Sequence, residues 1–220
     1  PPRSTLFPYT TLFRSRKEID DAYKCTSKEQ VRALKEIKRR LEVAESVMIN
    51  KLKNINIKID GTRISKLLKP IESVGCYVPG GKARYPSTLI MCVIPAKLAG
   101  VKRISVCSPP TKNGTLDPLT LVAADLCGVD EIYKVGGAQS IAAMAYGTET
   151  IKSVSKIVGP GGSYVTIAKA LASNKVTIDM LAGPTELLVF ADERAHVRSI
   201  VLDLISQAEQ IGRASCRERV

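Results

Sequence analysis

Hydrophobic residues recur along this chain with two different spacings, and the change between them divides the sequence. From Val31 to Met48 they return every three or four positions among charged residues, which predicts an amphipathic helix over about 27–48. Residues 26–30 match the Ser/Thr-x-x-Glu/Gln capping box that starts such helices. Residues 54–59 (NINIKI) alternate polar and apolar side chains, as a half-buried strand does.

From Val74 onward, short apolar runs alternate with helical stretches. The runs predict strands at 74–78, 103–107, 131–135, 155–158 and 176–179. Helices are expected over about 87–99, from Asp117-Pro118 to Gly128, up to Tyr146 and up to about Ala172. This alternation predicts the α/β class, a Rossmann-like parallel sheet with helices on both faces, preceded by an α-helical N-terminal arm.

Residues 178–210 contain a second candidate region. They read as a strand end, a Gly-Pro turn at 183–184, an apolar strand at 187–190 and a helix over about 197–209. Gln207 and Gln210 are three positions apart and therefore share one face of that helix. A helix can present two ligands to one site in this way.

The two ends of the chain lack this patterning. Residues 5–15 (TLFPYTTLFRS) look like the translation of a sequencing-library adapter, and residues 211–220 (IGRASCRERV) look like that of its reverse complement. We therefore expect 1–15 and 211–220 to lie outside the fold. Between them, residues 16–69 hold 15 basic and 8 acidic side chains, and residues 70–210 hold 13 and 12.

That basic excess leaves a nucleic-acid-binding module open as an alternative. A solvated helix face explains it better, because no aromatic residues are interleaved to stack on bases. No apolar run approaches the roughly 20 residues of a membrane span. The six cysteines form no CxxC pair, which favours reduced thiols in a cytoplasmic protein.

Three strand-to-helix turns are rich in glycine, at 77–81 (YVPGG), 136–139 (GGAQ) and 159–162 (GPGG). Open α/β sheets bind ligands beyond the carboxyl ends of their strands, and glycine lets backbone N–H groups approach a phosphate. Neither GxGxxG nor GxxxxGK[ST] is present. The three turns together still favour a nucleotide-binding protein.

Other candidate chemistry is weaker. The single histidine, His196, begins a helix in a charged stretch and is expected to be a surface residue. A serine hydrolase is disfavoured because GxSxG is absent. Asp179 and Glu186 flank the Gly-Pro-Thr turn, where they could form a glycosidase pair or, more commonly, cap backbone N–H groups.

Seven segments resemble the histidinol dehydrogenase family, and they occur in the family's order. They are VGCYVPGG (74–81), PAKLAGV (95–101), SVCSPP (105–110), CGVDEIYKVGGAQSIAAMAYGTE (127–149), KIVGPGGSYVTIAK (156–169), IDMLAGPTE (178–186) and LISQAE (204–209). The resemblance implies oxidation of L-histidinol through L-histidinaldehyde to L-histidine with two NAD and a zinc ion (Zn2+). It also implies a homodimer in the full-length protein. Another NAD-dependent alcohol or aldehyde dehydrogenase is disfavoured, because it should lack SQAE and AGPTE.

The resemblance places NAD contacts at Tyr77, Gln139 and Gly162. The family more often has asparagine at the last of these positions, so any contact of Gly162 must come from its backbone. Thr185 occupies the position of a serine that contacts substrate, and it keeps the hydroxyl group.

The resemblance also assigns metal ligands on the last helix. Gln207 matches a glutamine that binds zinc and contacts substrate. Gln210 stands where the family has a zinc-binding histidine. A hybrid codon at an adapter junction explains glutamine at this position, so we expect histidine there in the gene.

Residues beyond position 210 supply the family's remaining zinc ligands, an aspartate and a histidine, and the Glu-His pair that moves protons. The resemblance therefore implies that this chain is an inactive fragment. It places an NAD-side domain at 77–185, inserted between two parts of a catalytic domain at 16–76 and 186–210.

Overall fold

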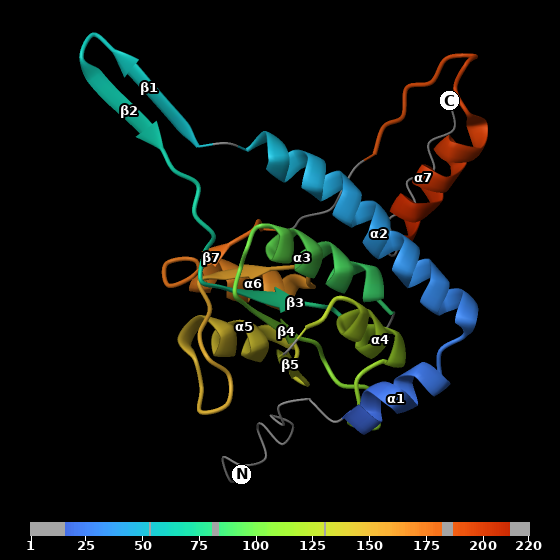
Figure 1. Ribbon diagram of the computed structural model, residues 1–220. Coiled ribbons are helices and arrows are strands. Elements are labelled where there is room, and N and C mark those ends of the chain that lie inside the picture. Colours follow the sequence, from blue (N-terminus) through green and yellow to red (C-terminus); the bar gives the residue numbers. More distant parts are fainter. Residues whose placement is uncertain (1–15, 53, 81–83, 130, 182–186, 212–220) are drawn as a thin grey trace. The chain divides into compact units, whose positions relative to one another are not determined.

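The computed structural model describes residues 16–52, 54–80, 84–129, 131–181 and 187–211, which belong to two compact units, 1–181 and 182–220. The first unit begins with a helical arm and a hairpin, and a five-stranded sheet follows (Figure 1). In the described residues no helix is long and apolar enough to cross a membrane.

The arm and hairpin comprise α1 (Arg16–Lys24), α2 (Lys28–Lys51), β1 (Ile55–Ile59) and β2 (Thr62–Lys66). The sheet region comprises β3 (Ser73–Tyr77), α3 (Pro86–Leu98), β4 (Arg103–Cys107), α4 (Pro118–Leu126), β5 (Glu131–Tyr133), α5 (Gly137–Tyr146), β6 (Lys156–Val158), α6 (Ser163–Ala172) and β7 (Thr177–Ile178).

The predicted amphipathic helix is confirmed as α2, and its start is fixed by a reciprocal capping box. The Gln30 N–H donates to the Ser27 hydroxyl at 3.1 Å, and the Ser27 N–H donates to the Gln30 side chain at 3.0 Å. Leu34 is buried, and α2 packs mainly on α3. The helix therefore joins the arm to the sheet region through one narrow apolar stripe.

The strand predicted at 54–59 exists as β1, but the expectation that it is half-buried is wrong. Every residue of β1 and β2 is exposed, because each strand of this antiparallel hairpin pairs only with the other. The second strand was not predicted. Asp60-Gly61 at its start is a hairpin turn signal, and both residues have positive φ (48° and 83°).

The predicted Rossmann-like sheet is confirmed. Its five strands are all parallel and lie in the order β5-β4-β3-β6-β7. The chain first adds strands on one side of β3 and then crosses to the other side at β6, so the winding direction reverses between β3 and β6. Strands β5 and β7 are shorter than predicted, at three and two residues.

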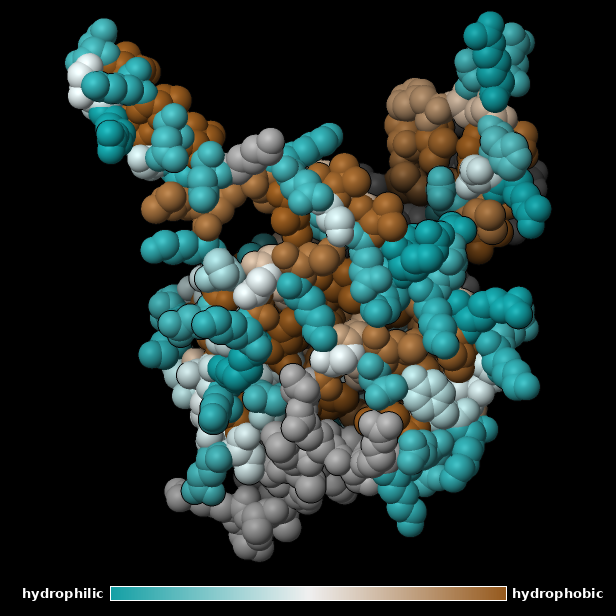
Figure 2. Space-filling view, in the orientation of Figure 1, coloured by the Kyte–Doolittle hydropathy of each residue, from teal (hydrophilic) through white to brown (hydrophobic). Residues whose placement is uncertain are grey.

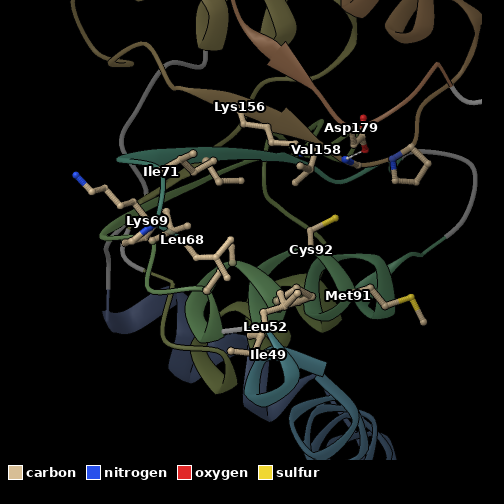
Figure 3. Close-up of a pocket in the computed structure, with 18 residues that line it drawn as sticks. Ile49, Leu52, Leu68, Lys69, Ile71, Met91, Cys92, Lys156, Val158 and Asp179 are labelled. Atoms are coloured by element: carbon tan, nitrogen blue, oxygen red, sulfur yellow. Dashed lines mark hydrogen bonds between the residues drawn. The ribbon is translucent and has the colours of Figure 1, made fainter. Parts of the chain in front are cut away.

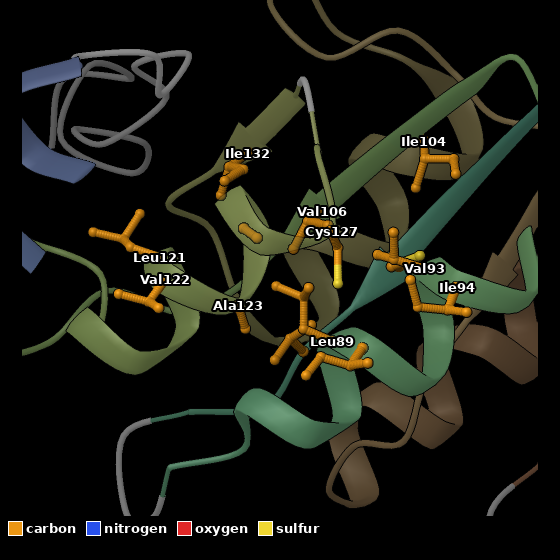
Figure 4. Close-up of a cluster of buried hydrophobic side chains, with 14 of the residues drawn as sticks. Leu89, Val93, Ile94, Ile104, Val106, Leu121, Val122, Ala123, Cys127 and Ile132 are labelled. Atoms are coloured by element: carbon orange, nitrogen blue, oxygen red, sulfur yellow. The ribbon is translucent and has the colours of Figure 1, made fainter. Parts of the chain in front are cut away.

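Helices cover both faces of the sheet, as predicted. Alternate side chains of β3 point to opposite faces. Val74 and Cys76 belong to the cluster under α3 and α4, and Figure 4 shows part of it, with Leu89 and Val93 on α3 and Val122 on α4. Tyr77 belongs to the cluster under α5 and α6, which also contains Tyr133, Ile141, Met144 and Ile157.

The second unit holds α7 (Val197–Ile211), which confirms the predicted helix. The strand predicted at 187–190 is wrong, because those residues form neither helix nor strand. Leu188 and Phe190 are 76% and 89% exposed. A strand needs a neighbour for its backbone hydrogen bonds, and none of the described strands pairs with this segment.

Candidate functional site

The three glycine-rich turns follow β3, β5 and β6 and therefore lie at one edge of the sheet, beyond the carboxyl ends of its strands. Tyr77 contacts both of the other turns. Its hydroxyl oxygen accepts a hydrogen bond from the Gly137 N–H at 3.2 Å. Burial raises the pKa of this hydroxyl, so it remains a neutral phenol that fixes the start of α5.

The turn after β6 lies directly against Tyr77. Gly159 has φ +112°, and a Cβ there would lie 2.1 Å from the Tyr77 carbonyl oxygen. Only glycine permits both that conformation and that approach. The β3 and β6 turns are therefore in contact at the point where the winding of the sheet reverses, which is where such sheets bind ligands.

Pro109, in the loop after β4, links the remaining turns. A Cβ on Gly136 would lie 2.5 Å from the Pro109 side chain, and one on Gly80 would lie 3.2 Å from it. Glycine at these positions lets the loops after β3, β4 and β5 pack closely together. All four loops therefore form one continuous edge.

The helices that start at this edge differ at their N-caps. Asp117 caps α4, as predicted, and its carboxylate accepts hydrogen bonds from Leu119 N–H at 3.0 Å and Thr120 N–H at 3.3 Å. The N-caps of α5 and α6 are Gly136 and Gly162, which provide no side-chain cap. The Gly137 N–H donates to Tyr77, and the Val165 N–H donates to the Gly162 carbonyl at 2.9 Å. The earlier N–H groups of a helix have no acceptor within the helix itself.

This donor set suits an anion. Backbone N–H groups at a helix N-terminus, together with the positive end of the helix dipole, are the usual site of a bound phosphate. A Cβ on Gly162 would meet no atom within 4 Å, so the start of α6 is sterically open. The residues at this edge therefore fit the pyrophosphate of a dinucleotide such as NAD.

The structure places the predicted NAD contacts at this edge. Gln139 is exposed in the first turn of α5, and its side-chain oxygen would lie 2.8 Å from a Cβ on Gly137. Gln139 and Tyr77 thus meet at the same turn, and Gly162 caps the neighbouring helix. Their contacts with NAD remain predictions.

Lys169 was not predicted as a site residue, but it anchors the turn after β6. It is only 2% exposed, and its ammonium group donates to the Gly159 carbonyl at 3.0 Å and to the Asp179 carboxylate. Asp179 in turn accepts a hydrogen bond from the Gly159 N–H at 2.8 Å. The interpretation of Asp179 as a cap for backbone N–H groups therefore fits the structure.

The sequence does contain a signal for Lys169. It lies at helical spacing between Val165 and Ala172, the other two buried residues of α6. A lysine on an otherwise apolar helix face is unusual, because a buried ammonium group needs a partner. That partner, Asp179, is ten residues away across a turn, and the spacing alone does not reveal it.

The remaining predicted site residues lie outside this edge. Thr185 and Glu186 fall outside the described residues. Gln207 and Gln210 both lie on α7, but their side chains are not described. His196 is exposed, as expected, and its Nδ1 accepts a hydrogen bond from the Ser199 N–H at 3.3 Å at the start of α7.

The part of the chain that is described contains no complete zinc site. Structural and catalytic zinc sites use at least three histidine, cysteine or carboxylate ligands. Across the described ranges, no group of three such residues lies close enough to hold a metal ion. Two glutamines on one helix do not replace them.

Comparison with known proteins gives a consistent answer. The family model for histidinol dehydrogenase matches residues 6–217. The chain is 48% identical to the histidinol dehydrogenase of Methanocaldococcus jannaschii over 200 residues, which is 91% of this chain and 47% of that protein. It is 58% identical to that of Geobacillus kaustophilus over 158 residues, 72% of this chain and 37% of that protein.

A solved structure shows the same fold. The crystal structure of histidinol dehydrogenase from Elizabethkingia anophelis matches with a TM-score of 0.82 and 42% identity, covering 91% of this chain and 46% of that one. The chain thus spans about half the length of the curated relatives it matches, 47% in the first case.

Proposed function

Because the chain belongs to the histidinol dehydrogenase family, a family of NAD-dependent dehydrogenases of histidine biosynthesis, we propose that its sheet edge binds NAD. The observation that carries the proposal is the contact between the β3 and β6 turns at the winding reversal, beside the open N-termini of α5 and α6. We further propose that the whole protein oxidises L-histidinol through L-histidinaldehyde to L-histidine with two NAD and zinc.

The residues of this edge would act mainly by positioning. The N–H groups of α6 and α5 bind the pyrophosphate, and Tyr77 holds the second turn in register through Gly137. The exposed carboxamide of Gln139 is free to hydrogen-bond the cofactor. Bound NAD supplies the hydride acceptor. The pair Lys169–Asp179 keeps the Gly159 peptide fixed while the cofactor enters and leaves.

The domain arrangement belongs to the same proposal. Residues 77–185 form the NAD-side domain, inserted in a catalytic domain that includes 16–76 and 186–210. Thr185 and Gln207 contact the substrate, and Gln207 is a zinc ligand together with the histidine encoded where Gln210 stands. The protein acts in the cytoplasm as a homodimer, and the basic face of α2 is a solvated helix surface without a nucleic-acid partner.

Ion pairs within α2 support that last point. Glu36 binds Arg39 at 2.8 Å and Arg40 at 2.7 Å, and Lys38 pairs with Glu42 at 3.3 Å. Three of the seven basic side chains of α2 are thereby paired along the helix itself. A salt-dependent shift of arbitrary RNA by this chain would instead favour the nucleic-acid interpretation.

Titration of the isotope-labelled chain with NAD, followed by amide NMR, tests the proposed site. We expect the largest shifts at Gly137, Gly161, Gly162 and Ser163. The matched variants are Gly162→Asp and Gly162→Asn. Both side chains cap α6 equally well, but only aspartate places a negative charge where the phosphate binds.

The aspartate variant should bind NAD roughly tenfold more weakly than the asparagine variant, a difference of about 1.4 kcal/mol. Equal affinities, or shifts that map elsewhere, would contradict the proposal.

The 220-residue chain alone should neither reduce NAD with L-histidinol nor retain zinc. Turnover by this chain would refute that part, and a codon other than one for histidine at 210 in the gene would refute the junction hypothesis.

A further inference from the structure

An apolar cavity of about 660 Å³ opens on the α3 side of the sheet and is lined at one end by Gly159 of the turn after β6. It lies between the end of α2, residues 68–71, α3 and the edge formed by β6 and the start of its turn. Figure 3 shows its walls. Most of the lining is hydrophobic, including Ile49, Leu52, Ile71, Met91, Pro95 and Val158.

One corner of this cavity carries polar groups. Cys92 of α3 lines it, and so do Gly159 and Asp179 of the opposite wall. Lys169 approaches from behind Gly159, since it binds both Gly159 and Asp179. A thiol and a carboxylate therefore line the same otherwise apolar space, and the buried ammonium group of Lys169 binds that carboxylate.

Cys92 also contacts a second thiol. Cys76 of β3 is fully buried in the core cluster against which Cys92 packs. The Cys76 thiol hydrogen-bonds the Cys92 sulfur, which lowers the pKa of Cys92 and raises that of Cys76. Burial and the charge of Asp179 act against this hydrogen bond and raise the pKa of Cys92, whereas the charge of Lys169 lowers it.

The other described cysteines lack this combination. Burial raises the pKa of Cys107 to about 12 and that of Cys127 to about 11, so both are poor nucleophiles. Cys25 is exposed and does not line the cavity. Among the cysteines that the structure describes, Cys92 alone joins access to a cavity with a neighbouring thiol donor.

We propose that Cys92 is a covalent modification site for apolar electrophiles, of the class of alkenes conjugated to a carbonyl group, that fit the cavity. The Cys92 sulfur forms a bond to the β-carbon of the alkene. The π-electron pair moves onto the carbonyl oxygen as an enolate, and the proton released from Cys92 returns to the α-carbon through water. Cys76 is the positioning residue that holds the Cys92 sulfur by its hydrogen bond.

Competition between cysteines of the intact chain tests the site. The chain is treated with N-phenylmaleimide or with a carboxylate-bearing maleimide, and peptide mass spectrometry gives the rate at each cysteine. Cys25 serves as the internal reference. Because the cavity is apolar, the Cys92-to-Cys25 rate ratio should be roughly tenfold higher for the phenyl reagent than for the charged one.

Two pairs of variants test the effect of the cavity and the effect of Cys76 separately. Cys76→Ala should slow Cys92 severalfold with both reagents, and Cys76→Ser, which keeps a donor, should restore much of the rate. Ile71→Lys adds a charge at a wall residue that is already 42% exposed, and it should reverse the reagent preference at Cys92. Ile71→Gln is its uncharged control.

A reagent-independent ratio, or a Cys92 that reacts more slowly than Cys25 with both reagents, would overturn the site. An unchanged Cys92 rate in Cys76→Ala would overturn the role of Cys76. Urea midpoints of all variants are measured alongside. A variant that unfolds is recognised by rapid labelling of Cys107 and Cys127. In that case the more conservative variant of the pair, Cys76→Ser or Ile71→Gln, decides the outcome.

Discussion

The hairpin β1–β2 and the sheet β3–β7 are built from similar strands and have opposite burial. Ile55, Ile57 and Ile59 alternate along β1, and Ile57 lies opposite Ile64 of β2, so one face of the hairpin is apolar. All four isoleucines are at least 44% exposed, whereas Ile157 of β6 is fully buried. Figure 2 shows apolar side chains at the surface of the hairpin.

The comparison shows that alternating polar and apolar residues predict a strand but do not predict whether the strand is buried. A strand becomes buried when a second layer covers it, and α3, α4, α5 and α6 provide that layer only for the sheet. In the described residues no element other than its partner strand packs substantially on either hairpin strand. Hairpin residues should therefore tolerate changes that the sheet does not.

The largest contrast is expected between two isoleucines. Ile157→Ala removes a fully buried side chain and should lower the free energy of unfolding by about 3–4 kcal/mol. Ile57→Ala, in the hairpin, should cost less than about 1 kcal/mol. Urea unfolding followed by circular dichroism measures both. Similar costs would show that the hairpin is packed after all.

Glycine substitutions sharpen the contrast within one turn. Gly159→Ala adds a Cβ against the Tyr77 carbonyl at positive φ, and it should cost about 3 kcal/mol. Gly162→Ala, three residues later, meets nothing within 4 Å and should cost less than about 1 kcal/mol. If both variants unfold at the same urea concentration, the close contact of the two turns is not a determinant of stability.

The buried ion pair gives a smaller effect. Lys169→Met leaves the Asp179 carboxylate without its main partner, and we expect a loss of about 2 kcal/mol, since Asp179 is still partly solvated. Exposed Lys175→Met is the matched control and should be neutral. Hydrogen exchange should also show faster exchange of the Gly159 amide in Lys169→Met alone. Unchanged exchange there would contradict the anchoring role.

The smallest effect belongs to the exposed arm and depends on pH. Hydrogen bonds from Arg39 and Arg40 lower the pKa of Glu36 from 4.5 to about 2. A carboxyl group with a lowered pKa stabilises the fold above its unfolded pKa, and this contribution is lost as the pH falls towards about 2. The helicity of the chain should therefore exceed that of Glu36→Gln slightly near pH 6, and the difference should vanish near pH 2. Glu45→Gln is the control, and an equal difference at both pH values would contradict the assignment.

The sequence predicted most of the fold because its signals are local. The capping box of α2, Asp117 as N-cap and the strand at 103–107 all occur where expected. Burial of β1 and pairing of 187–190 depend on distant partners, so the pattern predicted both incorrectly.

The candidate site was also predictable only in part. Glycines mark the turns after β3, β5 and β6 in the sequence, so the edge of the sheet could be predicted. The contact of Gly159 with Tyr77 and the pairing of Lys169 with Asp179 depend on how β6 and β7 are placed beside β3. No local rule encodes these long-range distances.

The N-caps of α4, α5 and α6 have a consequence for how such a sheet acquires ligand sites. One carboxylate distinguishes the start of α4 from the starts of α5 and α6, and Arg84 also binds that carboxylate at 3.1 Å. Asp117 occupies with its own oxygens the N–H groups that an incoming phosphate would use. A single change from aspartate to glycine would therefore free the two N–H groups that Asp117 now occupies, and free N–H groups are what an anion needs at a helix start. The number of phosphate positions along a sheet edge of this kind can vary by point mutation without any change of fold.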